Sequence, residues 1–254
     1  MKRKVFIIGI GAGNPDFVTV QAINALNQAS VFFIPHKGAG KADLARLRHE
    51  ICERYVASQA YRIVDFDLPS RDKSGAAYKE GVKAWHGEVE QVYERLLAEE
   101  LGEEEYGAFL SWGDPSLYDS MLRIFASIAA KGRYQLDYEV IPGISSVQAL
   151  AAAHKIPLNR IGESIMITTG RRLADGFPSN ADSVVVMLDG QSALQSIGDD
   201  VEIYWGANIG TEDEVLVSGR LKDVADEIER VRRAVREQRG WVMDTYLLKK
   251  PDQA

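Results

Sequence analysis

The chain has 254 residues, of which 46% are hydrophobic and 26% charged, as in ordinary globular proteins with one large or two small domains. Its formal net charge of −7 argues against general binding to nucleic acid or anionic membranes, but is compatible with a local basic pocket for a small anion. The single cysteine, Cys52, excludes an intrachain disulfide and a multi-cysteine metal site. No apolar stretch approaches the roughly 20 residues that span a bilayer. We therefore expect a cytoplasmic protein without metal, nucleic-acid or membrane partners.

A buried strand and a glycine-rich loop begin the chain. Residues 5–8 form a continuous apolar run, typical of a strand covered on both faces, and residues 9–16 indicate a turn-rich loop. A helix and a second strand at residues 31–34 are expected next, an order that also occurs in dinucleotide-binding proteins. The third glycine of that fingerprint is replaced by Asn14, however, and no acid follows the second strand to hold a ribose hydroxyl. A nucleotide-binding oxidoreductase is therefore the weaker alternative.

Basic residues follow the second and third predicted strands. His36 and Lys37 stand at the carboxyl end of the second strand, where open α/β sheets usually bind ligands, and Lys37 is suited to hold carboxylates. Residues 61–68 predict a third strand. The polar loop after it carries Arg71 and Lys73, which could cover a substrate.

The stretch from residue 107 to residue 120 is the centre of the predicted site. Its apolar run stops at Gly113, which permits close approach of the backbone, Asp114 adds acceptor oxygens, and Pro115 suits the first turn of a helix. Taken alone, a strand, Gly-Asp-Pro and a helix are also an ordinary connection. The glycine loop at residues 9–16 and a Pro-Gly turn at residues 142–146 favour the interpretation as a ligand-binding loop.

A Pro-Gly turn separates the two halves of the chain. Residues 142–146 read Pro-Gly-Ile-Ser-Ser and precede an alanine-rich helix, whose free N–H groups and hydroxyls could hold a ligand. This turn is also the best candidate for a boundary between domains of residues 1–141 and 142–254. Several strands of the second half follow one another without a helix, which implies antiparallel pairs. We predict two α/β domains, the first with a mainly parallel sheet and the second with a mixed sheet.

Three segments together resemble the tetrapyrrole (corrin and porphyrin) methylases. They are residues 5–19 with Gly-x-Gly-x-Gly-Asn-Pro-Asp, residues 111–118 around Gly-Asp-Pro, and residues 141–146 with Pro-Gly-Ile-Ser-Ser. Within the family, residues 33–38 and 112–120 are most similar to members that methylate precorrin-5 at C-1 in cobalamin biosynthesis and release its acetyl group as acetate. The resemblance implies S-adenosylmethionine folded into a cleft between the two domains, a tetrapyrrole substrate and a homodimer.

The resemblance also assigns residues by their positions. Its cofactor contacts fall on loops and strand ends: Ala12, Gly113, Asp114, Leu117, Ser145, Ser146, Leu188 and Ala207. Many members have proline in place of Ala12, a difference that leaves a backbone contact available. Because the family's substrate carries several carboxylates, we expect basic side chains to bind it, and the candidates are Lys37, Arg71, Lys73, Arg171 and Arg172.

The expected chemistry has two parts. Methyl transfer from a sulfonium to carbon depends mainly on positioning, so we expect neither a dedicated nucleophile nor a metal for it. Deacetylation requires attack of water on a ketone carbon, assisted by a general base or by stabilisation of the oxyanion, and the candidates are His36, Tyr118 and Asp119. Other activities stay open: methylation of another corrin-ring carbon, of diphthine or of ribosomal RNA, and binding of S-adenosylmethionine without catalysis. The net charge of −7 disfavours RNA.

Overall fold

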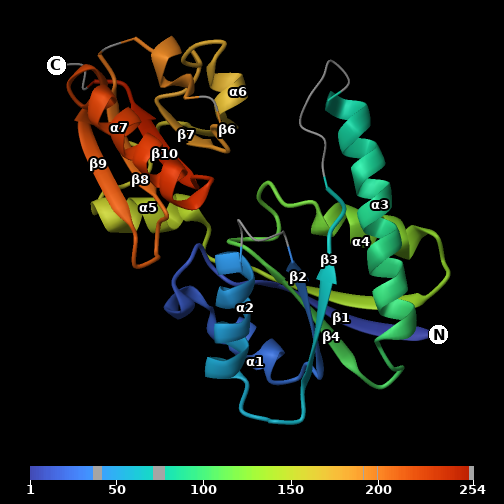
Figure 1. Cartoon of the computed structure of the whole chain (residues 1–254). Helices are drawn as coiled ribbons and strands as arrows, with labels where there is room; N and C mark the ends of the chain where they lie inside the picture. The colour runs from blue at the N-terminus through green and yellow to red at the C-terminus, as the bar shows by residue number, and fades with distance from the viewer. Residues whose placement is uncertain (37–41, 71–77, 191, 199, 252–254) are drawn as a thin grey trace. The chain divides into compact units, whose positions relative to one another are not determined.

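The chain forms two compact units in the computed structural model, Met1–Ile144 and Ser145–Ala254 (Figure 1). The structure describes residues 1–36, 42–70, 78–190, 192–198 and 200–251. Each unit combines one five-stranded sheet with helices, which confirms the predicted pair of α/β domains.

The first unit is built on a parallel sheet with the strand order β3-β2-β4-β1-β5. All of its neighbouring strands run parallel, so their carboxyl ends lie along one edge of the sheet. The prediction of a mainly parallel first sheet is therefore confirmed. The strands are β1 (Lys2–Gly9), β2 (Val31–His36), β3 (Arg62–Asp67), β4 (Tyr106–Ser111) and β5 (Gln135–Ile141).

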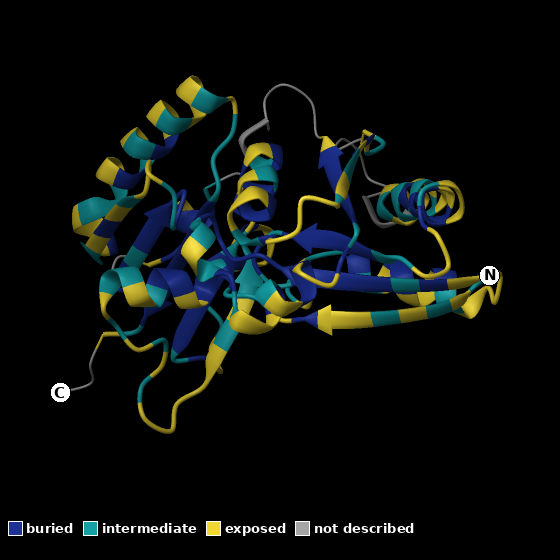
Figure 2. Ribbon diagram, turned by 90° about the horizontal axis from the view of Figure 1, so that it is seen from below, coloured by how far each residue is buried: buried dark blue, intermediate teal, exposed yellow. Residues whose placement is uncertain are grey.

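Helices cover both faces of this sheet. Alternate residues of β1 explain why: Phe6 and Ile8 pack in a core with α1 and α2, whereas Val5 and Ile7 pack in a core with α3 and α4 (Figure 1). The three inner strands β2, β4 and β1 are mostly buried, whereas the two edge strands β3 and β5 are more exposed (Figure 2). The helical elements are η1 (Pro15–Phe17), α1 (Val20–Leu26), α2 (Ala42–Tyr55), α3 (Tyr78–Glu99) and α4 (Met121–Ala130).

The second unit contains the predicted mixed sheet, with the order β6-β7-β10-β8-β9. Strands β6 and β7 run parallel, and the other neighbours run antiparallel. Its core surrounds the fully buried Trp205 and Tyr246, and Leu221 and Ile228 of α7 pack into this core. The elements are α5 (Ser146–His154), β6 (Ile165–Thr169), α6 (Gly170–Leu173), β7 (Ser183–Met187), η3 (Ala193–Ser196), β8 (Glu202–Ala207), β9 (Val215–Arg220), α7 (Leu221–Arg239) and β10 (Asp244–Lys249).

The long helix α7 buries a cation as well as an apolar stripe. Arg232 is only 4% exposed, and its Nε lies 2.9 Å from Oδ2 of the buried Asp244 on β10. The same Asp244 oxygen accepts a hydrogen bond from the indole N–H of Trp205 at 3.1 Å. An arginine-rich helix can thus look like a solvated surface in the sequence while one of its arginines binds it to the sheet.

Across the described part of the chain, no helix has both the length and the apolar character that crossing a membrane requires.

Candidate functional site

Three glycine-containing turns meet at the carboxyl edge of the parallel sheet. Gly11 and Gly113 form an antiparallel bridge, in which the Gly113 N–H donates to the Gly11 carbonyl at 2.8 Å. Both have positive φ, +83° and +69°, a region that favours glycine. A Cβ built on Gly9 would lie 2.6 Å from the backbone nitrogen of Gly143. These glycines therefore permit close approach of backbone to backbone, which shapes the surface of the predicted cofactor loop.

Asp114 joins two of these turns through its carboxylate. Its Oδ2 accepts from the Gly143 N–H at 2.9 Å, and its Oδ1 accepts from the Ser116 N–H at 2.8 Å and from the Ser116 hydroxyl. Burial alone would raise the pKa of Asp114, but the hydrogen bonds from Ser116 and Gly143 outweigh it and lower the pKa below its usual value. The carboxylate is therefore ionised and fixed in place at neutral pH.

The other cofactor residues predicted for this unit lie on the same turns. Ala12 follows the Gly11 bridge and is buried, so a ligand would meet its backbone. Leu117 is half-buried, and its N–H donates to the Asp114 carbonyl at 3.2 Å. The structure thus brings Ala12, Gly113, Asp114 and Leu117 to one edge of the sheet.

Two of the predicted catalytic residues, Tyr118 and Asp119, adjoin α4. Tyr118 is 44% exposed and has a φ of +54°. Asp119 accepts from the Met121 N–H at 2.6 Å through Oδ1, and from the Ser111 hydroxyl at 3.2 Å through Oδ2. The Asp119 carboxylate therefore caps the start of α4 and joins it to the end of β4. A direct catalytic role for either residue stays a prediction.

His36, the third predicted catalytic residue, ends β2 beside a carboxylate. Its Nε2 lies 3.1 Å from Asp65 Oδ1, and Nε2 of His49 on α2 lies 3.3 Å from the same oxygen. His36 is about half exposed, so its ring can be reached from solvent. Its catalytic role also stays a prediction. The predicted substrate residues Lys37, Arg71 and Lys73 fall outside the described residues.

A serine–histidine pair was missed by the sequence analysis. His86 of α3 places its Nε2 2.8 Å from the Oγ of Ser120, the residue before α4, and both residues are partly exposed. The two residues are 34 positions apart in the sequence, and His86 follows the partly buried Trp85 within α3, so no local motif marked them. Only the packing of α3 against α4 reveals the pair.

In the second unit, the predicted cofactor residues also gather at one edge of their sheet. Strand β10 pairs with both β7 and β8. Its Thr245 lies opposite Met187, the residue before Leu188, and its Asp244 lies opposite Ala207. The hydroxyls of Ser146 and Thr245 lie 2.8 Å apart, which brings the start of α5 to the same edge. The neighbouring Ser145 is buried as the N-cap of α5, where its Oγ accepts from the Val147 N–H at 3.1 Å and Gln148 completes a capping box.

Two residues at this edge have the backbone conformation and the side-chain environment of a ligand site. Leu188 has a φ of +55° and is 66% exposed, an unusual state for a large apolar side chain. Asn208, directly after Ala207, has a φ of +51° and is buried, and among the described residues its Nδ2 meets no hydrogen-bond acceptor. A buried amide donor without a partner is costly, so a bound ligand with an acceptor atom would fit it. The sequence offered no signal for Asn208.

Arg171 and Arg172, the described substrate candidates, lie in the short helix α6. Both are exposed, and α6 begins where β6 ends. Because β6 runs parallel to β7, this helix lies at the same end of the sheet as Leu188. The geometry of the second unit is therefore compatible with substrate-binding arginines near the predicted cofactor residues.

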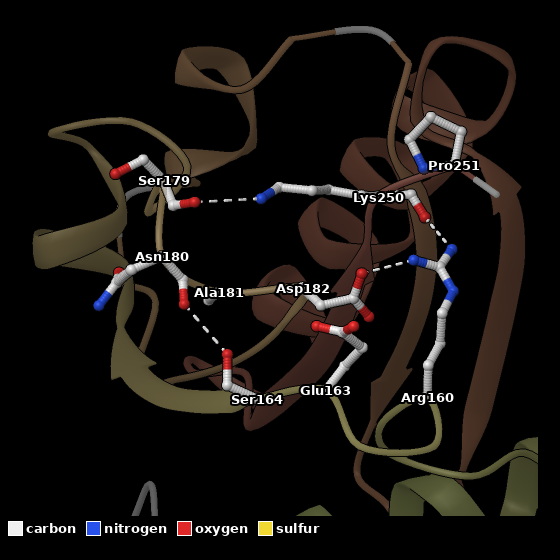
Figure 3. A pocket seen from close by; sticks show the side chains of 9 residues that line it. All are labelled: Arg160, Glu163, Ser164, Ser179, Asn180, Ala181, Asp182, Lys250 and Pro251. Carbon is white, nitrogen blue, oxygen red and sulfur yellow. Dashed lines mark hydrogen bonds and ion pairs between the residues drawn. The ribbon is translucent and has the colours of Figure 1, made fainter. Parts of the chain in front are cut away.

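A polar pocket lies at the opposite end of the same sheet (Figure 3). Lys249 pairs with Ser183 there, at the start of β7, whereas Leu188 follows its end. The basic groups of the pocket bond within its lining: Arg160 pairs with Asp182 and donates to the Lys250 carbonyl, and the Lys250 ammonium donates to the Ser179 carbonyl at 3.3 Å. These bonds and its position make the pocket a poor candidate for the site. Among the described residues, no group of three His, Cys, Asp or Glu side chains could hold a metal ion.

Comparison with known proteins agrees with the arrangement of loops and strands. The family model described as Tetrapyrrole (Corrin/Porphyrin) Methylases matches residues 4–225. A precorrin-6A synthase [deacetylating] from Sinorhizobium sp. is 53% identical over 249 residues, which cover 98% of this chain and 95% of the relative.

Solved structures show the same fold. A cobalamin synthesis related protein (CobF) from Corynebacterium diphtheriae is 37% identical, with a TM-score of 0.85 over 99% of this chain and 100% of that one. The fold also matches that of uroporphyrin-III C-methyltransferase from Thermus thermophilus complexed with S-adenyl homocysteine, at 17% identity and a TM-score of 0.60 over 97% of each chain. The chain belongs to the tetrapyrrole (corrin/porphyrin) methylases.

Proposed function

We propose that this protein is an S-adenosylmethionine-dependent C-methyltransferase of cobalamin biosynthesis, which methylates precorrin-5 at C-1 and releases the acetyl group as acetate to give precorrin-6A. The observation that carries the proposal is the 53% identity, over nearly the whole chain, to a relative named as the deacetylating precorrin-6A synthase. The similarity of 37% over the full length of the C. diphtheriae structure supports the same assignment.

The residues at the two sheet edges fit S-adenosylmethionine as the methyl donor. In the first unit, Gly113 and the fixed Asp114 carboxylate offer polar groups on a turn that the glycine contacts hold rigid. In the second unit, the exposed Leu188 suits an apolar ring face, and the Asn208 amide suits a ring or ribose acceptor. The cofactor supplies the methyl group, and the protein's part is to hold an electron-rich carbon in line with it.

Deacetylation and methylation are chemically coupled in this proposal. Addition of an oxygen nucleophile to the acetyl carbonyl lets the bond from that carbon to C-1 break, and the electron pair stays on C-1. The conjugated macrocycle stabilises this pair, and C-1 then takes the methyl group. Deacetylation thus generates the nucleophile that methylation requires, so both steps need the same bound substrate.

Substrate binding is assigned to basic side chains. Arg171 and Arg172 are exposed on α6, where guanidinium groups can bind carboxylates in bidentate fashion. Lys37, Arg71 and Lys73, outside the described residues, remain candidates on chemical grounds alone. Local cations of this kind would orient a polycarboxylate on a protein whose net charge is −7.

The decisive experiment is incubation of the protein with precorrin-5 and S-adenosylmethionine. Mass analysis should find one added methyl group and the loss of one acetyl group, with free acetate in equal amount. Methylation without acetate would replace the proposal by another corrin-ring methyltransferase of this family. Calorimetric titration with NADH and S-adenosylmethionine tests the cofactor, and only the second should bind.

A further inference from the structure

We propose that Ser120 and His86 form the acyl-transfer pair that removes the acetyl group, with Ser120 as the nucleophile and His86 as its general base. This inference rests on the proposed function, because it assigns residues to the deacetylation step. His86 Nε2 lies 2.8 Å from Ser120 Oγ. At that distance an imidazole can accept the hydroxyl proton as the oxygen attacks a carbonyl.

The hydroxyl of Ser120 is directed to His86 because another residue caps the helix. A serine at the N-cap position ordinarily accepts from an N–H group of the first turn. Ser120 makes no such bond, and the Asp119 carboxylate accepts from the Met121 N–H instead, at 2.6 Å. Asp119 thus has a structural role that leaves the neighbouring serine oxygen for chemistry.

The pair lies near the carboxyl edge of the parallel sheet, where the predicted cofactor residues of the first unit also lie. Helix α3 follows β3, and the indole N–H of Trp85 donates to the Pro69 carbonyl, just beyond the end of that strand, at 2.9 Å. His86 is therefore near the carboxyl ends of the parallel strands. Ser120 ends the segment that begins with the bridged Gly113. Both side chains are partly exposed, so a substrate carbonyl can reach them.

The proposed step balances without any further reagent. Ser120 Oγ bonds to the acetyl carbonyl carbon while its proton moves to His86 Nε2. The bond between that carbon and C-1 then breaks, leaving the electron pair on C-1 and an acetyl ester on Ser120. C-1 takes the methyl group from the sulfonium, and the pair of the broken carbon–sulfur bond stays on sulfur. After His86 has released its proton to solvent, it deprotonates the water that hydrolyses the ester, which frees acetate and restores the serine hydroxyl.

A simple ester tests the nucleophile independently of the tetrapyrrole. The wild-type protein is incubated with p-nitrophenyl acetate, quenched with acid and digested, and the peptides are analysed by mass spectrometry. We expect one acetyl group on Ser120, absent from Ser120→Ala and strongly reduced in His86→Asn. The matched control is Ser127→Ala, which removes an exposed serine of α4 and should acetylate like the wild type. A wild-type protein that carries no acetyl group on Ser120 would overturn the assignment.

Turnover of precorrin-5 separates this inference from the proposed function. Ser120→Ala and His86→Asn should each lower the rate of acetate release by roughly 100-fold or more, and the double variant should lose little beyond either single variant. Their affinity for S-adenosylmethionine, measured by calorimetry, should match the wild type, which shows that the fold is intact. If wild type and Ser120→Ala release acetate equally fast, the pair is wrong and the proposed function stands. If the wild type releases none, the proposed function fails and the role of the pair in deacetylation fails with it, whatever the ester assay shows of the reactivity of Ser120.

Discussion

At Gly143, a single added methyl group would meet backbone atoms of two other turns. A Cβ there would lie 2.8 Å from the Gly9 Cα and closer still to the Gly113 carbonyl oxygen. Because backbone cannot turn aside as a long side chain can, we expect Gly143→Ala to lower the free energy of unfolding by about 2–3 kcal/mol. It should also weaken binding of S-adenosylmethionine, since the Asp114 carboxylate would lose the Gly143 N–H.

Denaturant unfolding and calorimetric titration measure the two effects. The matched control is Gly87→Ala on α3, where an added Cβ has open space and should stabilise the helix by about 0.5–1 kcal/mol. A Gly143→Ala protein as stable as the wild type would show that the three turns can separate without cost.

Asn208 offers a test of the predicted cofactor site at the edge of the second sheet. Its φ of +51° suits asparagine or glycine, so Asn208→Gly keeps the backbone and removes the unpartnered Nδ2. We expect unfolding of the free protein to require at least as much free energy as before, because a buried donor without a partner is removed. Affinity for S-adenosylmethionine should fall about tenfold, the loss expected from one hydrogen bond.

The prediction holds only if the affinity for S-adenosylmethionine falls while the free energy of unfolding does not. A variant whose stability and affinity fall together would mean that Asn208 supports the strand end alone. Unchanged affinity would mean that the amide does not face the ligand.

At the scale of elements, a buried ion pair between Arg232 and Asp244 joins α7 to β10. The carboxyl group of Asp244 makes the stability of the folded protein depend on pH. Burial raises the pKa of Asp244 to about 6, an effect that Arg232 and the Trp205 hydrogen bond oppose. Between about pH 4 and pH 6 the unfolded chain has released this proton while the folded protein still holds it. The folded state therefore loses stability as the pH rises through this window, by up to about 3 kcal/mol.

Asp244→Asn mimics the protonated side chain and should not show this loss. Its free energy of unfolding should match the wild type near pH 4 and exceed it above pH 6, when both are measured with denaturant. Asp226→Asn, on the exposed face of α7, controls for the removal of one negative charge. A difference between wild type and Asp244→Asn that is constant from pH 4 to pH 7 would contradict the prediction.

Elements were easier to predict than the contacts between them. Residues 5–8 already indicated a strand buried on both faces, because an apolar run without alternation is typical of such a position. The burial of Arg232 and the meeting of His86 with Ser120 depend on which helix faces pack together, and neither pair has a local signature. Likewise, the close approach expected at Gly113 includes one to the backbone of Gly11, which no local signal indicated, while its contact with a ligand stays a prediction.

At the scale of the whole molecule, the sequence predicted both sheets because strand spacing differs between the halves. Long helices separate the first strands and favour parallel neighbours, whereas β8 and β9 follow each other closely and pair antiparallel. Most predicted cofactor residues lie at strand ends, so knowing the sheets was nearly enough to group them within each unit. Asn208 could not be predicted from the sequence, because the burial of its amide is a property of the folded chain.

The overall charge leads to a prediction about substrate binding. The protein is acidic, with a net charge of −7, so a polycarboxylate substrate must be held by local cations. Changing Arg171 and Arg172 on α6 together to glutamine should raise KM for precorrin-5 about tenfold, since exposed ion pairs contribute about 0.2–1 kcal/mol each. The rise should shrink at high salt, which screens the same interaction in the wild type. Affinity for S-adenosylmethionine should stay near the wild-type value.

The matched control is the double variant Lys222→Gln with Arg233→Gln, on the exposed face of α7. It removes two positive charges elsewhere on the protein and should leave KM unchanged. If the control raises KM as much as the α6 variant does, the net charge and not the position of the arginines governs binding.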